Sequence, residues 1–100
     1  MILTTTNSVE GFKIAEYKGI VSGTAVNIQK MEWTFSMQKY YAGMSEGISE
    51  IKDQAFQQLE ANASKLNANA IVGISVDIEL TSTNYITVTA TGTAVSIIKK

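Results

Sequence analysis

Residues 48–80 read ISEIKDQAFQQLEANASKLNANAIVGISVDIEL, and they contain two successive hydrophobic periods. In the first half, apolar residues recur at steps of three or four: Ile48, Ile51, Ala55, Leu59, Ala63 and Leu66. This spacing predicts one amphipathic helix that begins between residues 45 and 49 and ends near Leu66, because such steps place side chains on one helical face. Asn67 follows directly and can adopt the left-handed conformation that ends a helix.

In the second half of this stretch the hydrophobic period changes to two. Apolar residues at alternate positions predict a strand, with Ala70, Val72, Ile74, Val76, Ile78 and Leu80 on one face. Residues 81–84 are typical of a hairpin loop, and a return strand follows with Ile86 and Val88 among its apolar positions. Beyond Gly92 the apolar residues move to odd positions, and we predict a β-bulge at Gly92 and Thr93 as the cause.

The N-terminal third of the chain is also typical of β-structure. We expect a short strand at residues 2–6, a turn at 7–11 and a long strand at 12–28, with a bend or bulge at Gly19 or Gly23. Parallel strand pairs need a crossover connection, usually a helix. The order of elements therefore predicts an α+β fold, a two-layer βαββ unit with one helix on a mixed sheet, in a single domain over residues 1–100.

Residues 30–38 alternate between apolar and polar side chains, which favours an additional strand. This segment is rich in aromatic residues and methionine, as the cores of protein interfaces are. A single helix also leaves one face of the sheet exposed to solvent, so we expect the protein to self-associate. The alternative is that the segment covers the core of its own domain. The predicted interface comprises Met31, Trp33, Phe35, Met37, Tyr40 and Tyr41.

The composition excludes several classes of function. The chain contains no His, Cys or Pro, and all eight basic residues are Lys. It therefore lacks the groups for a Ser-His-Asp triad, a thiolate nucleophile, an ordinary zinc site or a disulfide. A net charge of -1 and the absence of Arg argue against nucleic acid as a partner. No stretch approaches the ~20 apolar residues of a membrane span, and no signal-peptide pattern is present, so we expect a cytoplasmic protein.

Two carboxylates are the main candidates for a site. Asp77 and Glu79 lie two positions apart in a predicted strand, so both should emerge on the same face, about 7 Å apart. They could bind a hard cation or act as an acid–base pair, and Glu16 could join them from a neighbouring strand. An ordinary solvated sheet face is the simpler interpretation. We find no recognisable catalytic motif, assign no catalytic residue, cofactor or metal ligand, and favour a non-catalytic protein.

Three short motifs resemble signatures of a known family. They are residues 16–23 (EYKGIVSG), residues 63–74 (ASKLNANAIVGI) followed by Asp77 and Glu79, and residues 92–95 (GTAV). Together they are similar to the YbjQ-like family of small bacterial and archaeal proteins, which carries a heavy-metal-binding label. The chain departs from the family pattern at residues 43–47 (GMSEG), where the family usually has a Gly-Gly-Arg loop, and at Asn67, where it usually has Gly.

The resemblance implies a βαββ subunit that assembles into a ring-like homopentamer, with extra short strands at the subunit contacts. On this basis we expect a small ligand or ion at the subunit contacts, where carboxylates from several copies could converge. Two alternatives remain open: a purely structural or protein-interaction ring without a ligand, and a carboxylate-based enzyme at the subunit interfaces. A soft metal is a poor prospect, because the chain offers neither thiolate nor imidazole.

Overall fold

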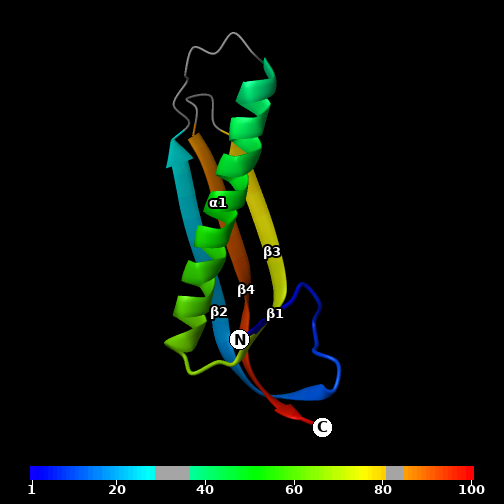
Figure 1. The fold of residues 1–100 in the computed structure, drawn as a ribbon. Coiled ribbons are helices and arrows are strands. Elements are labelled where there is room, and N and C mark those ends of the chain that lie inside the picture. Colours follow the sequence, from blue (N-terminus) through cyan, green and yellow to red (C-terminus); the bar gives the residue numbers. More distant parts are fainter. Residues whose placement is uncertain (29–36, 81–84) are drawn as a thin grey trace.

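The computed structural model describes the backbone of residues 1–28, 37–80 and 85–100, and the side chains of residues 1–26, 48–80 and 85–100. Within these residues one helix lies lengthwise on one face of a mixed sheet (Figure 1). The α+β fold with a single helix on a mixed sheet is thereby confirmed. The elements are β1 (Ile2–Leu3), β2 (Phe12–Ile28), α1 (Met37–Ser64), β3 (Ala70–Leu80) and β4 (Tyr85–Lys99).

The strands lie in the order β1-β3-β4-β2. β4 is antiparallel to both of its neighbours, while β1 runs parallel to β3 through Ile2 opposite Ala70. The predicted strand at residues 2–6 is shorter than expected, but Thr4 continues its contact with β3 by accepting a hydrogen bond from the Ile74 amide at 3.1 Å. The predicted hairpin loop at residues 81–84 lies outside the described residues.

The helix begins at Met37, earlier than expected, and the predicted strand at residues 30–38 is therefore wrong at its last two positions. Apolar residues also recur at helical steps here, through Met37, Tyr40, Met44 and Ile48, so both periods were available to this sequence. At the other end, Asn67 has a φ of 61°, which confirms its predicted left-handed conformation. The Ala68 amide bonds back to the Ala63 carbonyl, completing a Schellman-type helix terminus.

The main core lies between α1 and the two strands beneath it, β2 and β4. Ile51, Ala55 and Leu59 on the helix are almost fully buried against small and branched residues of these strands. The closest approach is at Gly23, where an added Cβ would lie 2.1 Å from the Ala55 carbonyl oxygen. The helix therefore rests over β2 and β4 and leaves β3 less covered.

A second, smaller core lies on the opposite face, near the end of the sheet that holds the chain termini. It contains Ala70 and Val72 of β3 with Val95 and Ile97 of β4, and partly buried side chains of the N-terminal third pack against it. This core explains why the apolar positions of β4 change from even to odd. The strand is unbroken, but its buried face changes from the helix side, at Ala90 and Ala94, to the opposite side, at Val95 and Ile97.

The predicted bulge at Gly92 and Thr93 is consequently wrong for β4, which pairs with β2 through this region without a shift. The irregularity lies directly opposite, in β3, between Val72 and Ser75, where Gly73 has a φ of 62°. The extra residue exchanges the two faces of β3. Ala70 and Val72 therefore face the second core, contrary to the single apolar face that the sequence predicts.

The long strand β2 also contains irregularities, which the sequence predicts only in part. Its register with β4 shifts between Ile14 and Glu16 and again between Tyr17 and Gly19. The second shift confirms the bulge predicted at Gly19 or Gly23, and Gly19 has a φ of 136°. Among the described residues, no helix combines the length and the apolar character needed to cross a bilayer.

Candidate functional site

Asp77 and Glu79 lie on the face of β3 that points away from the helix. Their neighbour Ile78 pairs with Val88, which is buried beneath α1, and successive side chains of a strand alternate between faces. Both carboxylates belong to exposed residues, as expected. The residues opposite them on β4 are threonines, Thr89 and Thr87, so no lysine pairs with them across the strands.

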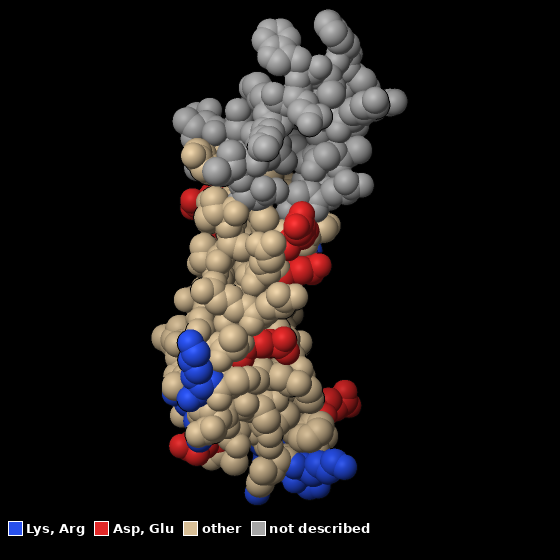
Figure 2. All heavy atoms as spheres, turned by 60° about the vertical axis from the view of Figure 1, so that its left-hand side comes forward, with Lys and Arg blue, Asp and Glu red and all other residues tan. Residues whose placement is uncertain are grey.

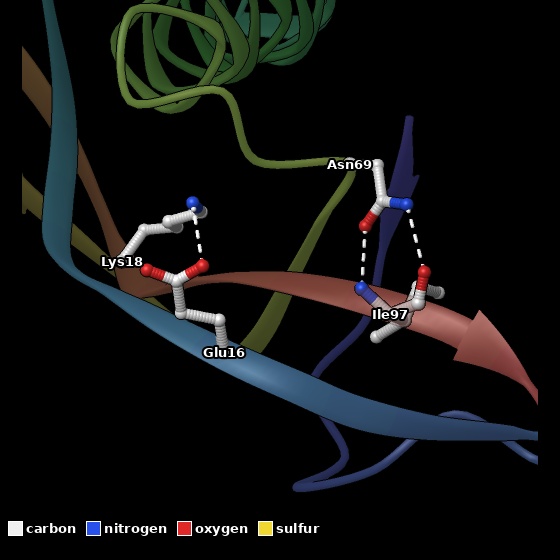
Figure 3. A network of polar contacts seen from close by, with 4 residues as sticks. All are labelled: Glu16, Lys18, Asn69 and Ile97. Atoms are coloured by element: carbon white, nitrogen blue, oxygen red, sulfur yellow. Dashed lines mark hydrogen bonds and ion pairs between the residues drawn. The ribbon is translucent and has the colours of Figure 1, made fainter.

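Glu16 lies elsewhere in the molecule. Its Oε2 is 3.0 Å from Lys18 Nζ, and the two side chains point toward each other on β2 (Figure 3). The register puts Asp77 level with Thr24 of β2, through Thr89 of β4. From Glu16 to Thr24 the strand extends about 26 Å. A single subunit therefore brings Asp77 and Glu79 together but not Glu16.

No metal centre forms within one chain from the part that the structure describes, since no group of three or more His, Cys, Asp or Glu residues lies close enough to hold an ion. Two carboxylates on one strand provide fewer ligands than the six to eight oxygens that Ca²⁺ takes. Among the described residues of one chain, Asp77 and Glu79 therefore do not provide enough ligands for an ion site.

An apolar groove opens on the helix-facing side of β3, where the helix does not reach across. The groove has a volume of about 210 Å³. Its lining combines residues that precede β2, one residue of α1 and two of β3: Leu3, Thr4, Thr5, Phe56, Ile74 and Val76. Further along the same face of β3, Ile78 and Leu80 are 46% and 62% exposed. The predictions from the sequence do not include this groove; the available signal is Phe56, which lies beside the apolar stripe of the helix.

The edge strand next to this groove is open along half of its length. Beyond Ile74, whose amide bonds to Thr4, residues 75–80 pair with β4 on one side and with no described strand on the other. An unpaired edge exposes backbone donors and acceptors that can pair with an added strand. The groove and this open edge together form the candidate site, with Asp77 and Glu79 on its far side.

Asn69, in the second motif, has a structural role. Its side-chain amide donates to the Ile97 carbonyl at 2.9 Å and accepts from the Ile97 amide at 2.7 Å (Figure 3). The side chain thus replaces one rung of the sheet where β3 begins. The motif therefore serves the fold of the chain at this position.

The predicted interface residues can be placed only in part. Met31, Trp33 and Phe35 lie outside the described residues. Met37, Tyr40 and Tyr41 belong to the backbone of α1, while their side chains also lie outside the described part. Figure 2 shows a described surface that is mostly uncharged, with the visible lysines gathered toward one end.

Comparison with known proteins agrees with this fold. A family model described as "Putative heavy-metal-binding", that of the YbjQ family, matches residues 1–98. The chain belongs to the YbjQ family. A relative from Acetivibrio thermocellus, named UPF0145 protein, is 34% identical and covers 97% of this chain and 99% of its own length. A UPF0145 protein of Clostridium kluyveri is 36% identical over the same shares of both chains.

A solved structure shares the YbjQ fold as seen here. It is a protein of unknown function from Pediococcus pentosaceus, assigned to the DUF74 family, with a TM-score of 0.74 and 24% sequence identity over 98% of both chains. At this identity the likeness concerns the fold alone. The heavy-metal description of the family has no counterpart in a cluster of ligands among the described residues of this member.

Proposed function

We propose that this YbjQ-family protein is a non-catalytic, cytoplasmic homo-oligomer that binds a small ligand or ion at its subunit contacts. We further propose that the assembly is a ring, and the copy number of five rests on the family resemblance. The observation that carries the proposal is that one helix covers only part of the sheet and leaves large apolar side chains exposed.

The shape of the subunit supports self-association. Its Cα radius of gyration is 16.6 Å with extents of 57 × 22 × 16 Å, whereas a compact chain of this length would have a radius of about 13 Å. A rod this thin leaves large apolar residues in solvent, including Ile20 at 80%, Tyr17 at 69% and Val26 at 53% exposure. Apolar surface of this kind is buried when copies associate.

A ring would also supply ligands that the described part of one chain does not provide at the acidic pair. Each copy presents Asp77 and Glu79 on the uncovered sheet face. Equivalent pairs from several copies could surround an axis, and carboxylate oxygens favour a hard cation such as Ca²⁺ or Mg²⁺. The alternative, a carboxylate-based enzyme at the subunit interfaces, has weaker support, because the sequence contains no recognisable catalytic motif.

Native mass spectrometry in ammonium acetate tests this proposal. We expect a single oligomer, with five copies as the predicted number, and bound mass that disappears when Asp77 and Glu79 are replaced by Asn and Gln. Replacement of exposed Glu50 and Asp53 on α1 by Gln and Asn is the matched control. An oligomer without bound mass would favour the ring without a ligand, and a particle of one-chain mass at micromolar concentration would contradict the proposal.

A further inference from the structure

The two edges of the sheet differ in their capacity to accept a strand. On the β2 edge, two helix side chains already bond to the backbone. The Thr24 amide donates to Gln58 Oε1 at 2.8 Å, and Asn62 Nδ2 donates to the Ser22 carbonyl at 2.7 Å. Gly23, between them, permits the close approach of the helix that brings both amides within reach. We call this arrangement the amide clamp; it closes the β2 edge at its centre.

The β3 edge has no such protection over residues 75–80 among the described parts of the chain. A strand added here would have a different environment on each face. On the helix-facing side its side chains would lie beside Ile78 and Leu80 and next to the apolar groove. On the other side they would lie beside Asp77 and Glu79, with no lysine on the adjacent part of β4.

Two pairings of a second copy with this edge are unfavourable. A second copy whose β2 met this edge at the same level would present residues from Ser22 onward, where the amide clamp already uses the backbone. A second β3 pairing in antiparallel orientation would bring its own Asp77 and Glu79 close to the first pair, and like charges across strands are destabilising. A strand with the opposite charge pattern has neither difficulty.

We propose that the β3 edge binds an extended peptide segment of another protein, in which lysine or arginine alternates with large apolar residues. The backbone of the peptide pairs with residues 75–80, as in β-strand addition to other open sheets. Its apolar side chains lie along Ile78, Leu80 and the groove, while its basic side chains lie opposite Asp77 and Glu79. This partner surface goes beyond the proposed function and does not depend on the copy number of the assembly, although at Asp77 and Glu79 the basic side chains of the peptide would compete with the proposed ion.

A labelled synthetic peptide, Lys-Val-Lys-Ile-Lys-Leu-Lys, tests the proposal by fluorescence anisotropy with the full-length protein. We expect saturable binding, and slower amide hydrogen exchange at residues 75–80 when the peptide is present. A peptide of the same composition with its four lysines grouped at one end should bind at least roughly tenfold more weakly, because its side chains cannot satisfy both faces of the edge.

Charge reversal provides the deciding comparison. The double variant Asp77→Lys, Glu79→Lys should lose roughly tenfold or more in affinity for the basic probe and gain affinity for Glu-Val-Glu-Ile-Glu-Leu-Glu. The control variant Glu50→Lys, Asp53→Lys changes the same charge on the exposed face of α1 and should bind the basic probe as the wild type does. Far-UV circular dichroism verifies that both variants are folded.

Three outcomes would overturn the proposal. The first is absence of saturable binding, and the second is equal binding by the Asp77→Lys, Glu79→Lys variant. The third is an edge that is already protected from exchange in the free protein and loses this protection only on dissociation, since a second copy would then be the occupant. Native mass spectrometry of the same samples reports the oligomer separately, so loss of this inference leaves the proposed assembly untouched.

Discussion

Gln58 and Asn62 stand four residues apart on α1 and both bond to the backbone of β2. Replacing both with Ala removes two hydrogen bonds, each worth about 1 kcal/mol. We expect the free energy of unfolding to fall by about 1–2 kcal/mol in urea titrations, and light scattering to report more association because the β2 edge is opened. The neighbouring Gln57→Ala variant, also at an exposed position, is the control.

Equal scattering by the Gln58→Ala, Asn62→Ala variant and by Gln57→Ala would show that the amide clamp does not protect the edge. The sequence does not indicate this role. Asn62 lies within the apolar stripe and Gln58 at its border, and this position alone does not specify which groups their amides bond. Their contacts depend on how far the helix is displaced across the sheet, and this displacement is a property of the packed structure.

At the scale of elements, the approach of α1 to β2 depends on Gly23. An added Cβ would lie 2.1 Å from the Ala55 oxygen and 2.6 Å from the Leu59 nitrogen, both backbone atoms that cannot rotate away. The Gly23→Ala variant should therefore shift the helix and lose about 2–3 kcal/mol of stability, measured from the urea midpoint.

The matched control for this substitution is Gly11→Ala. Gly11 has a φ of 82° and no neighbouring atom within 4 Å of an added Cβ, so the cost there arises from backbone strain alone, about 1 kcal/mol. If Gly23→Ala were no more destabilising than Gly11→Ala, the close contact between helix and strand would not contribute as described.

The elements themselves were largely predictable, because α1 beyond Ile48 and β3 each carry one sustained period and β4 alternates on either side of Gly92. Two errors have physical causes. The helix start was misplaced because residues near Met37 satisfy both a strand period and a helical period. The bulge is predicted in β4 but lies opposite, in β3. Burial of Val95 in the second core moves the apolar residues of β4 to odd positions, as a bulge in β4 would.

At the scale of the whole molecule, the proposed assembly makes a prediction about Trp33 and Phe35. Their replacement with Ser should dissociate the oligomer, since large apolar side chains supply most of the binding energy of an interface. Analytical ultracentrifugation should report one-chain mass, while far-UV circular dichroism remains that of a folded βαββ unit. Unfolding of the subunit would instead assign these residues to the core of their own domain.

The candidate site was only partly predictable at this scale. Exposure of Asp77 and Glu79 on one face followed from alternation along β3. The groove and the open edge did not, because they exist only where α1 stops short of β3 and β1 ends after Leu3. Glu16 is separated from the acidic pair by strand register, which a single sequence does not specify.

The unequal margins of this sheet have a consequence for misassembly. Fibril growth requires each added strand to pair with a free border of the sheet and to present a free border of its own to the next strand. Here two helix amides occupy the middle of one border, so a long segment can add along residues 75–80 of the opposite flank more readily than across that middle. Continuous strand addition along the whole of both borders would first require Gln58 and Asn62 to release the backbone of β2.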